Sequence, residues 1–392
     1  MAAAGKIPNN NAPAAENDSD LEDEAVTENE LTSVNITKYQ AAGEIATKAL
    51  AAVVAAAVDG TTVLALCTVG DSTMQTLLKA VYVKDKKMSK GIAFPTCVSP
   101  TSIICHLSPL PSDPESTLTI KTGDMVRIEL GAHIDGYIGQ VAHTFVVGAS
   151  KENPVTGRKA DVLQAAYTAA EVAVRTIKPG NTSWAVSDLI TKAAKEFDCK
   201  AAEGMTTHQI LRNVLDGPKQ VVQNPADQSR KDIPEATFEE GEVYSIDVLI
   251  CTGEGKSKTL DTRTTVFKRN PNQTYQLKMK TSRAVFSEIT KNNGTMAFSL
   301  RHLEDEKKGR MGIAECVTHN LVTPYPVLHE KADVDSAHFM FTVLLMPSGQ
   351  LKVSSYPWDQ ESVVSEHKVN DAELVEILNR SLKNTKKKAA AK

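Results

Sequence analysis

Two short stretches of this chain repeat each other. The first reads Gly123-Asp-Met-Val-Arg-Ile-Glu129 and the second reads Gly241-Glu-Val-Tyr-Ser-Ile-Asp247. A strand that begins after each glycine places residues two apart on one face. We therefore expect Glu129 and Asp247 to end two strands in equivalent positions.

A second pair of features lies upstream. One apolar helical pattern ends at Asp59-Gly60-Thr61 and another ends at Pro179-Gly180-Asn181, and a shorter helical pattern follows each. The two helical patterns are 120 residues apart (Gly60 to Gly180) and the two strand motifs are 118 residues apart (Gly123 to Gly241), so the spacing of the repeats agrees. Chance likeness between amphipathic strands is the alternative, but two features at one offset favour an internal duplication. Two similar halves, each with a carboxylate on a central strand, suggest a metal site between the halves.

Length and composition limit the kind of protein that this chain can be. The chain has 392 residues, 41% of them apolar, which is enough for one large domain or two fused halves. The N-terminus lacks the basic and then apolar stretch of a secretory signal, and the longest apolar run, 49–58, is far short of the ~20 residues that span a bilayer. The six cysteines form no Cys-x-x-Cys pair, so we expect reduced thiols in an intracellular protein.

Charge is spread unevenly along the chain. Eight acids and no Lys or Arg lie in residues 7–37: Glu16, Asp18, Asp20, Glu22, Asp23, Glu24, Glu28 and Glu30. Without these acids and Lys6, the formal charge of −4 becomes +3 for residues 38–392. The segment has few apolar groups to offset its ordering entropy, so residues 1–36 are predicted to be a disordered acidic arm.

The remaining pattern predicts alternating helices and strands. In the first half we expect helices at 38–58, capped by Thr37, and at 71–83, then a basic loop at 84–90. A returning strand at 136–147 would bring Gln140 and His143 near Glu129. His106 follows an apolar run, where a lone histidine is more often structural than catalytic.

The second half repeats this order. Helices are expected at 159–177 and 184–197, followed by a loop that carries His208 and Asp216. Residues 281–322 are expected to be mostly helical, 339–346 to be the last strand and 371–382 the final helix.

Seven motifs along the chain are distinctive: Gly91-Ile-Ala-Phe-Pro-Thr96, Val141-Ala-His-Thr-Phe-Val-Val147, Gln223-Asn-Pro225, Gly253-Glu-Gly-Lys256, Leu277-Lys-Met-Lys-Thr-Ser-Arg283, Glu304-Asp-Glu-Lys-Lys308 and Phe341-Thr-Val-Leu-Leu-Met-Pro347. Through these motifs the chain resembles the proliferation-associated protein family, which includes ErbB-receptor-binding proteins and a fungal curved-DNA-binding protein. The resemblance implies an α/β (α+β) chain with the pita-bread (creatinase/aminopeptidase) fold of type II methionine aminopeptidase. The pita-bread domain would cover residues 37–378. Its two pseudo-symmetric halves would cover about 37–150 and 151–370, and the second half would contain a small helical insertion at about 272–330. A basic tail would follow at 379–392.

The active relatives bind two divalent metals through two Asp, one His and two Glu. Those positions carry over to Glu129, Gln140, His208, Asp247 and Met340, and the second catalytic histidine carries over to His106. Hard dications need anionic oxygen ligands, and only two of the four carboxylates remain. The resemblance therefore implies no cofactor and no metal-activated water to attack a peptide bond. A single-metal aminopeptidase that uses Glu129, His208 and Asp247 is the alternative.

The resemblance also implies a binding scaffold. The expected partners are the large ribosomal subunit or its RNA, DNA and other proteins, with no membrane partner, in the cytoplasm and nucleus with the nucleolus as a further location. Clustered basic residues support nucleic-acid binding, although a solvated face would explain each of them as well. The candidates are Lys84, Lys86, Lys87, Lys90, Lys256, Lys258, Arg263, Lys268, Arg269, Lys278, Lys280, Arg283, Lys307, Lys308 and Arg310. The 84–90 loop belongs to the other half of the fold from the insertion, so we expect it to be a separate surface.

A short apolar motif near the C-terminus has two interpretations. Leu374, Ile377 and Leu378 replace the relatives' Leu-x-x-Leu-Leu box and could anchor a helix in a partner's groove. Packing on the protein's own body explains the same spacing.

Overall fold

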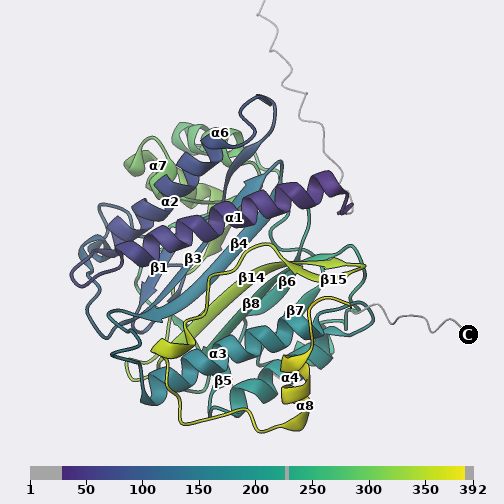
Figure 1. The fold of residues 1–392 in the computed structure, drawn as a ribbon. Helices are drawn as coiled ribbons and strands as arrows, with labels where there is room; N and C mark the ends of the chain where they lie inside the picture. Colours follow the sequence, from purple (N-terminus) through teal and green to yellow (C-terminus); the bar gives the residue numbers. More distant parts are fainter. Residues whose placement is uncertain (1–28, 226–228, 385–392) are drawn as a thin grey trace, which may run out of the picture.

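One antiparallel sheet runs through the whole protein. The computed structural model describes residues 29–225 and 229–384. The sheet has nine strands in the order β1-β3-β4-β14-β8-β6-β7, with β15 paired to β14 and β5 paired to β8 (Figure 1). The strands are β1 Lys90–Pro100, β3 Met125–Ile134, β4 Tyr137–Val146, β5 Lys200–Ala201, β6 Thr206–Ile210, β7 Gln220–Val222, β8 Val243–Cys251, β14 Ser336–Met346 and β15 Gly349–Lys352.

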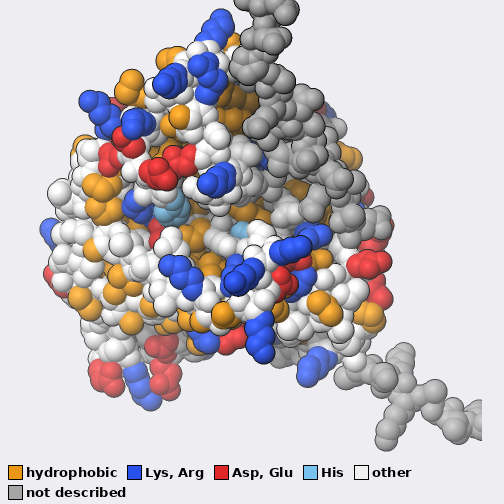
Figure 2. All heavy atoms as spheres, turned by 90° about the horizontal axis from the view of Figure 1, so that it is seen from above, with side chains coloured by type: hydrophobic (Ala, Val, Ile, Leu, Met, Phe, Trp, Pro, Cys, Tyr) orange, Lys and Arg blue, Asp and Glu red, His pale blue; other side chains and the backbone are white. Residues whose placement is uncertain are grey.

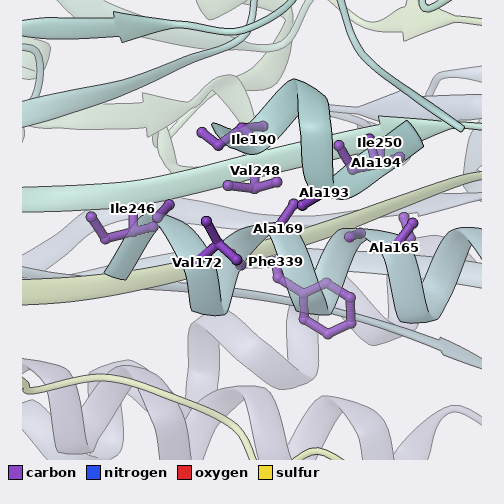
Figure 3. Close-up of a cluster of buried hydrophobic side chains, with 14 of the residues drawn as sticks. Ala165, Ala169, Val172, Ile190, Ala193, Ala194, Ile246, Val248, Ile250 and Phe339 are labelled. Carbon is purple, nitrogen blue, oxygen red and sulfur yellow. The ribbon is translucent and has the colours of Figure 1, made fainter. Parts of the chain in front are cut away.

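Two helix pairs cover the same face of this sheet, one pair for each half (Figure 1). The first pair is α1 Ser33–Ala56 and α2 Val63–Ala80, and the second is α3 Gly157–Thr176 and α4 Ser183–Lys195. In the second half, Ala165 and Ala169 of α3 pack with Ala193 of α4 against Val248 of β8 and Phe339 of β14 (Figure 3). Small alanine side chains allow helix and sheet backbones to approach closely, so this layer is buried without large side chains.

The repeated glycines have the same conformation in both halves. Gly60 and Gly180 have φ of 83° and 89°, and Gly123 and Gly241 have φ of 91° and 90°. Only glycine adopts this left-handed region at low cost, so the turn before each central strand requires it. The repeat seen in the sequence is therefore a structural repeat.

The central strands differ from the prediction in where they end. Glu129 and Asp247 lie inside β3 and β8, which continue to Ile134 and Cys251. Both strands are buried along their whole length, so the acid does not mark an exposed strand end. The predicted hairpin is present, with Gly131 opposite Gln140 and Ile128 opposite His143.

The insertion is a helix pair with a small sheet. Helices α6 Lys280–Asn293 and α7 Glu306–Thr318 flank the three-stranded sheet β11-β10-β12. These strands are β10 Val266–Arg269, β11 Ala297–Ser299 and β12 Val322–Tyr325. The expected helical run over 281–322 is therefore interrupted by β11, because Phe298 is buried against Phe267 of the neighbouring strand.

Several predicted boundaries are wrong. Helix α1 begins at Ser33, capped by Thr32, whereas the Thr37 hydroxyl donates to Ser33 O inside the helix. Helix α2 begins at Val63, since Thr62 caps it and Asp71 is a buried residue in its middle. Strand β14 begins at Ser336 and is followed by β15, so it is not the last strand.

The remaining elements are short. A second small sheet is formed by β2 Ile103–Cys105, β9 Lys258–Thr259 and β13 Leu328–His329. The 3-10 turns are η1 Pro114–Thr117, η2 Leu300–His302 and η3 Gln360–Ser362, and the two remaining helices of the described residues are α5 Ser229–Asp232 and α8 Ala372–Asn379. None of the helices in 29–225 and 229–384 is long and apolar enough to cross a membrane. Most of the predicted acidic arm and of the basic tail lies outside the described residues, and the predicted domain limits stay predictions.

A buried ion cluster fastens the insertion to the first half. The carboxylate of Asp71 on α2 accepts hydrogen bonds from Arg301 and from His302 Nε2 at 2.8 Å, and from Thr96 N at 2.9 Å. Burial by itself raises the pKa of Asp71, but the contacts with His302 and Arg301 hold that pKa well below its usual value. The carboxylate is therefore ionised in the folded protein.

We predict that Asp71→Asn destabilises the protein by about 3–5 kcal/mol, because it leaves a buried guanidinium without its counter-charge. Since the folded pKa of Asp71 is depressed, its contribution is present above pH ~4 and is lost as the pH falls toward the folded pKa. Urea denaturation at pH 7 and at pH 3 measures both effects. Glu361→Gln, which breaks the exposed Lys151–Glu361 pair, is the control and should cost less than about 1 kcal/mol. Equal losses for the two variants would contradict the anchoring role of Asp71.

Candidate functional site

Six residues that the sequence singles out meet in one place. Glu129, Gln140, His208, Asp247, Met340 and His106 all line a cavity of about 50 Å³ between the two halves of the sheet. They come from β3, β4, β6, β8, β14 and the loop after β2. A cavity of this size has room for very few water-sized groups.

Threonine hydroxyls join the strands around this cavity. Thr207 Oγ1 donates to Asp247 O and accepts from Asp247 N, both at 2.9 Å. Thr342 Oγ1 likewise donates to Gln140 O at 3.1 Å and accepts from Gln140 N at 2.8 Å. Thr144 Oγ1 donates to His338 O at 2.9 Å and accepts from His338 N at 2.7 Å. A hydroxyl carries one donor and two acceptor sites, so it can bridge both backbone groups of one residue.

Glu129 is held by the protein itself. Its side chain is buried, and its Oε1 accepts a hydrogen bond from the His106 backbone N–H at 2.7 Å. His106 has a φ of 65°, which is strained for a residue other than glycine. Its Nδ1 lies 3.0 Å from Pro326 O, so the neutral ring carries its proton there, and Nε2 lies 4.0 Å from Glu129 Oε2.

Asp247 has a partner that sequence reasoning missed. His338 Nε2 lies 2.7 Å from Asp247 Oδ1. Burial by itself lowers the pKa of His338, but the adjacent carboxylate of Asp247 holds that pKa above its usual value. The available signal was the period of two along β14, since His338 shares a face with Met340, which lies opposite Asp247.

The two remaining ligand positions carry no charge. Met340 is 5% exposed and offers only a thioether, and Gln140 is 4% exposed. No group in the described part of the chain is within hydrogen-bonding distance of Gln140 Oε1.

His208 faces a different carboxylate. Its Nε2 lies 3.9 Å from Asp216 Oδ1, and Asp216 also accepts from the Tyr325 hydroxyl at 3.2 Å and from Lys268. Burial by itself raises the pKa of Asp216, but His208 and Lys268 hold it below its usual value. His208 thus lies beside a polar cluster of Asp216, Lys268 and Tyr325 at the cavity.

These residues do not fit a divalent metal. A two-metal site needs anionic oxygens to neutralise and bridge the ions. One carboxylate oxygen of Glu129 already accepts from His106 N–H, and one of Asp247 already contacts His338 Nε2. The side chains of Gln140 and Met340 are neutral. Among residues 29–225 and 229–384, no three His, Cys, Asp or Glu are placed so that they could hold a metal ion. The single-metal alternative with Glu129, His208 and Asp247 therefore lacks its geometry as well.

Many of the predicted basic residues are engaged inside the protein. Lys268 pairs with Asp216, and Arg263 Nε donates to Asp113 at 2.8 Å. Lys90, Arg269 and Arg283 donate to backbone carbonyl oxygens. These side chains stabilise turns and strand ends, so they are poor candidates for phosphate contacts.

A second group of basic residues is exposed. It comprises Lys84, Lys86, Lys87, Lys256, Lys258, Lys278, Lys280 and Lys307. No ion pair with another described residue is found for any of these ammonium groups. Lys308 and Arg310 are intermediate cases, paired with Asp305 at 3.1 Å and with Ser112 Oγ at 3.0 Å.

The 84–90 loop and the insertion are neighbours, contrary to the expectation that they form separate surfaces. Lys90, the last residue of the loop, and Lys79, which precedes the loop on α2, line one cavity together with Asn292 and Asn293 of α6. Figure 1 shows α2 and α6 together at the top of the molecule, and Figure 2 shows several groups of Lys and Arg side chains on that face. Lys79 and Lys291, both exposed, also lie beside this cavity and were missed, because neither belongs to a run of basic residues in the sequence.

The C-terminal apolar motif packs on the protein itself. Leu374 and Ile377 of α8 are 0% and 2% exposed, and Leu378 packs against the same core cluster. They cannot anchor a partner, so that prediction is wrong and the packing interpretation holds.

Comparisons with known proteins identify the family of this chain. The model of metallopeptidase family M24 matches residues 37–299. The curved DNA-binding protein of Schizosaccharomyces pombe is 43% identical over 91% of this chain and 93% of its own length. ErbB-3 binding protein 1 of Solanum tuberosum is 44% identical over 93% and 92%, and proliferation-associated protein A of Dictyostelium discoideum is 37% identical over 95% and 96%.

Solved structures agree with the fold. A thermophilic Arx1 superposes with a TM-score of 0.85 at 32% identity, over 91% of this chain and 100% of that one. Methionine aminopeptidase from Thermotoga maritima superposes with a TM-score of 0.52 at 18% identity, over 83% and 98%, which supports the pita-bread fold alone. The chain therefore belongs to metallopeptidase family M24, among the proliferation-associated, ErbB-3-binding and curved-DNA-binding proteins.

Proposed function

We propose that the protein is a non-enzymatic scaffold that binds structured RNA through its phosphates and associates with the large ribosomal subunit in ribosome biogenesis, translation or growth control. The observation that carries this proposal is the set of exposed lysines on the 84–90 loop and on the insertion, two segments that meet at the end of α6. DNA and partner proteins are further ligands of the same scaffold, which would work in the cytoplasm and nucleus.

The surface has the chemistry that polyanions need. Phosphate contacts require cations on an accessible face, and each one that is formed releases counterions from the nucleic acid. Lys84, Lys86 and Lys87 lie on the loop, while Lys278, Lys280 and Lys307 lie on or beside α6 and α7. Because their ammonium groups have no ion-pair partner among the described residues, a phosphate does not have to displace one.

The names of the relatives support the same direction. One relative is named for binding curved DNA and another for binding ErbB-3. These names describe binding proteins in a family whose model is that of a metallopeptidase. A scaffold that kept the fold and gave up the ligands of the metal site accounts for both facts.

The cleft supports a protein without peptidase activity. The nucleophile of this fold is a water activated by metal ions. Gln140 and Met340 offer no carboxylate, and each of the two acids of the cavity already has a partner within the protein: Glu129 accepts from the His106 backbone N–H, and Asp247 lies 2.7 Å from His338 Nε2. The cleft thus supplies no group that would generate the nucleophile.

We predict that reversing Lys84, Lys86 and Lys87 to Glu weakens binding to structured RNA, and that reversing Lys278, Lys280 and Lys307 does so too. Each phosphate contact contributes a slope of roughly −0.7 to −0.9 when the logarithm of affinity is plotted against the logarithm of salt concentration. Each triple variant should therefore flatten the slope by about 2 units or more. Fluorescence anisotropy over a salt series measures it, and co-sedimentation with large ribosomal subunits tests the partner.

The control reverses Lys195, Lys200 and Lys368, which are exposed on the second half of the fold. It changes the net charge by the same amount and should leave the slope within about half a unit of the wild type. If the control lost as much affinity as the two test variants, net charge and not this surface would govern binding.

We also predict that Glu129→Gln leaves RNA binding unchanged. The substitution keeps the size of the side chain and lies in a buried cavity away from the lysine surface. Elemental analysis of the purified protein should find no stoichiometric zinc, manganese or cobalt, and a short peptide with N-terminal methionine should stay intact. Stoichiometric metal together with release of methionine would show an active aminopeptidase instead.

A further inference from the structure

A cavity of about 280 Å³ lies between α2 and the end of α6, two helices that Figure 1 shows near each other. Leu78 and Ile92, which are 5% and 9% exposed, form its apolar lining. The amide side chains of Gln75, Asn292 and Asn293 also line it. Pockets for drug-sized ligands have roughly 300–1,000 Å³, so this cavity suits a smaller flat group.

The three amides are free to bind a ligand. No hydrogen bond to the side chain of Gln75, Asn292 or Asn293 is made within residues 29–225 and 229–384. By contrast, His302 in the same cavity is engaged by Asp71 at 2.8 Å, and Lys90 donates to Val81 O at 2.5 Å. The structural polar groups of the cavity are thus satisfied, and the amides remain.

Amide groups beside an apolar surface match the chemistry of a nucleobase. Each amide offers both a donor and an acceptor, which can pair with the polar edge of a base. The apolar side chains of Leu78 and Ile92 can cover the face of the ring. A base within a duplex already uses its pairing edge and its faces, so only an unpaired base can enter.

Cations surround the cavity on both sides. Lys79 lines it, Lys291 lies one residue before Asn292 on α6, and the 84–90 loop connects α2 to β1 beside it. The phosphates on either side of a base could therefore contact lysines while the base enters the cavity. Both basic segments of the proposed RNA surface would then act on one nucleotide.

We propose that the cavity between α2 and α6 binds an unpaired nucleobase of an RNA strand. This inference rests on the proposed function and adds to it the kind of RNA that is preferred. A bulged or looped nucleotide within a structured RNA is the expected ligand, since duplex phosphates flank it.

The test compares two kinds of RNA hairpin with the full-length protein. One kind has a fully paired stem, and the other has a single-nucleotide bulge of A, C, G or U in the same stem. The double variant Gln75→Leu/Asn292→Leu removes two amides and changes no charge. Gln40→Leu is the matched control, because Gln40 is an exposed residue on α1. Fluorescence anisotropy gives affinities, and thermal melting shows that all variants are folded.

We expect the wild type to bind at least one bulged hairpin about tenfold more tightly than the paired hairpin. A gain of this size is typical of one additional contact between a protein and a base. The double variant should lose most of that preference and keep its affinity for the paired hairpin and its salt slope. Gln40→Leu should behave as the wild type.

Equal binding of all hairpins by the wild type, or a preference that survives in the double variant, would overturn this inference and leave the proposed function standing. If neither kind of hairpin bound in a salt-dependent way, the proposed function would fall, and this inference with it. If Gln40→Leu lost the preference for the bulged hairpin to the same extent as the double variant, the inference would also be overturned, since the preference would not come from the cavity.

Discussion

The two halves of the fold meet where β4 lies beside β14, and this junction depends on threonine hydroxyls as much as on backbone pairing. Backbone pairing between these strands is recorded only at Met340 with Ala142 and at Phe341 with Val141. Thr144 and Thr342 continue the connection by bridging both backbone groups of His338 and Gln140. A hydroxyl between two strands satisfies their buried polar groups where the strands do not pair directly. The cavity of the candidate site lies at this interruption, so the residues that hold the halves together also shape that cavity.

The same junction explains how the site keeps two buried carboxylates. An ionised group inside a protein needs a partner of opposite charge or several hydrogen bonds. In this chain Glu129 receives the His106 N–H and Asp247 receives His338, which lies on the strand that carries Met340. Gln140 and Met340 add no negative charge to the cavity, and the contact with Asp247 holds the pKa of the buried His338 above its usual value. The fold can therefore keep the strand positions of an aminopeptidase while its charge balance comes from within the chain.

Sequence reasoning reached the repeat because glycine before a central strand is required by the backbone. Gly123 and Gly241 share a left-handed φ, and the two strands that follow carry Glu129 and Asp247 into one cavity. His338 was missed because it lies in an apolar run, and the expected strand began one residue after it. The pairing of Lys268 with Asp216 joins positions 52 residues apart, and no local pattern signals such a contact. The charge run around Lys268 therefore looked like a binding surface, although part of it is used to hold the fold.

The position of the basic surface is a consequence of tertiary packing. The 84–90 loop and the insertion are about 200 residues apart in the sequence, and their charges alone do not indicate that they are neighbours. Asp71 on α2 binds Arg301 and His302, which immediately follow β11 of the insertion. This buried cluster holds the segment after β11 against α2, and in the same region Asn292 and Asn293 at the end of α6 line one cavity with Lys79 and Lys90. A network that is fully satisfied in a buried setting holds one arrangement rigidly. The contact between the 84–90 loop and the end of α6 therefore depends on a buried ion cluster that joins residues 230 and 231 positions apart.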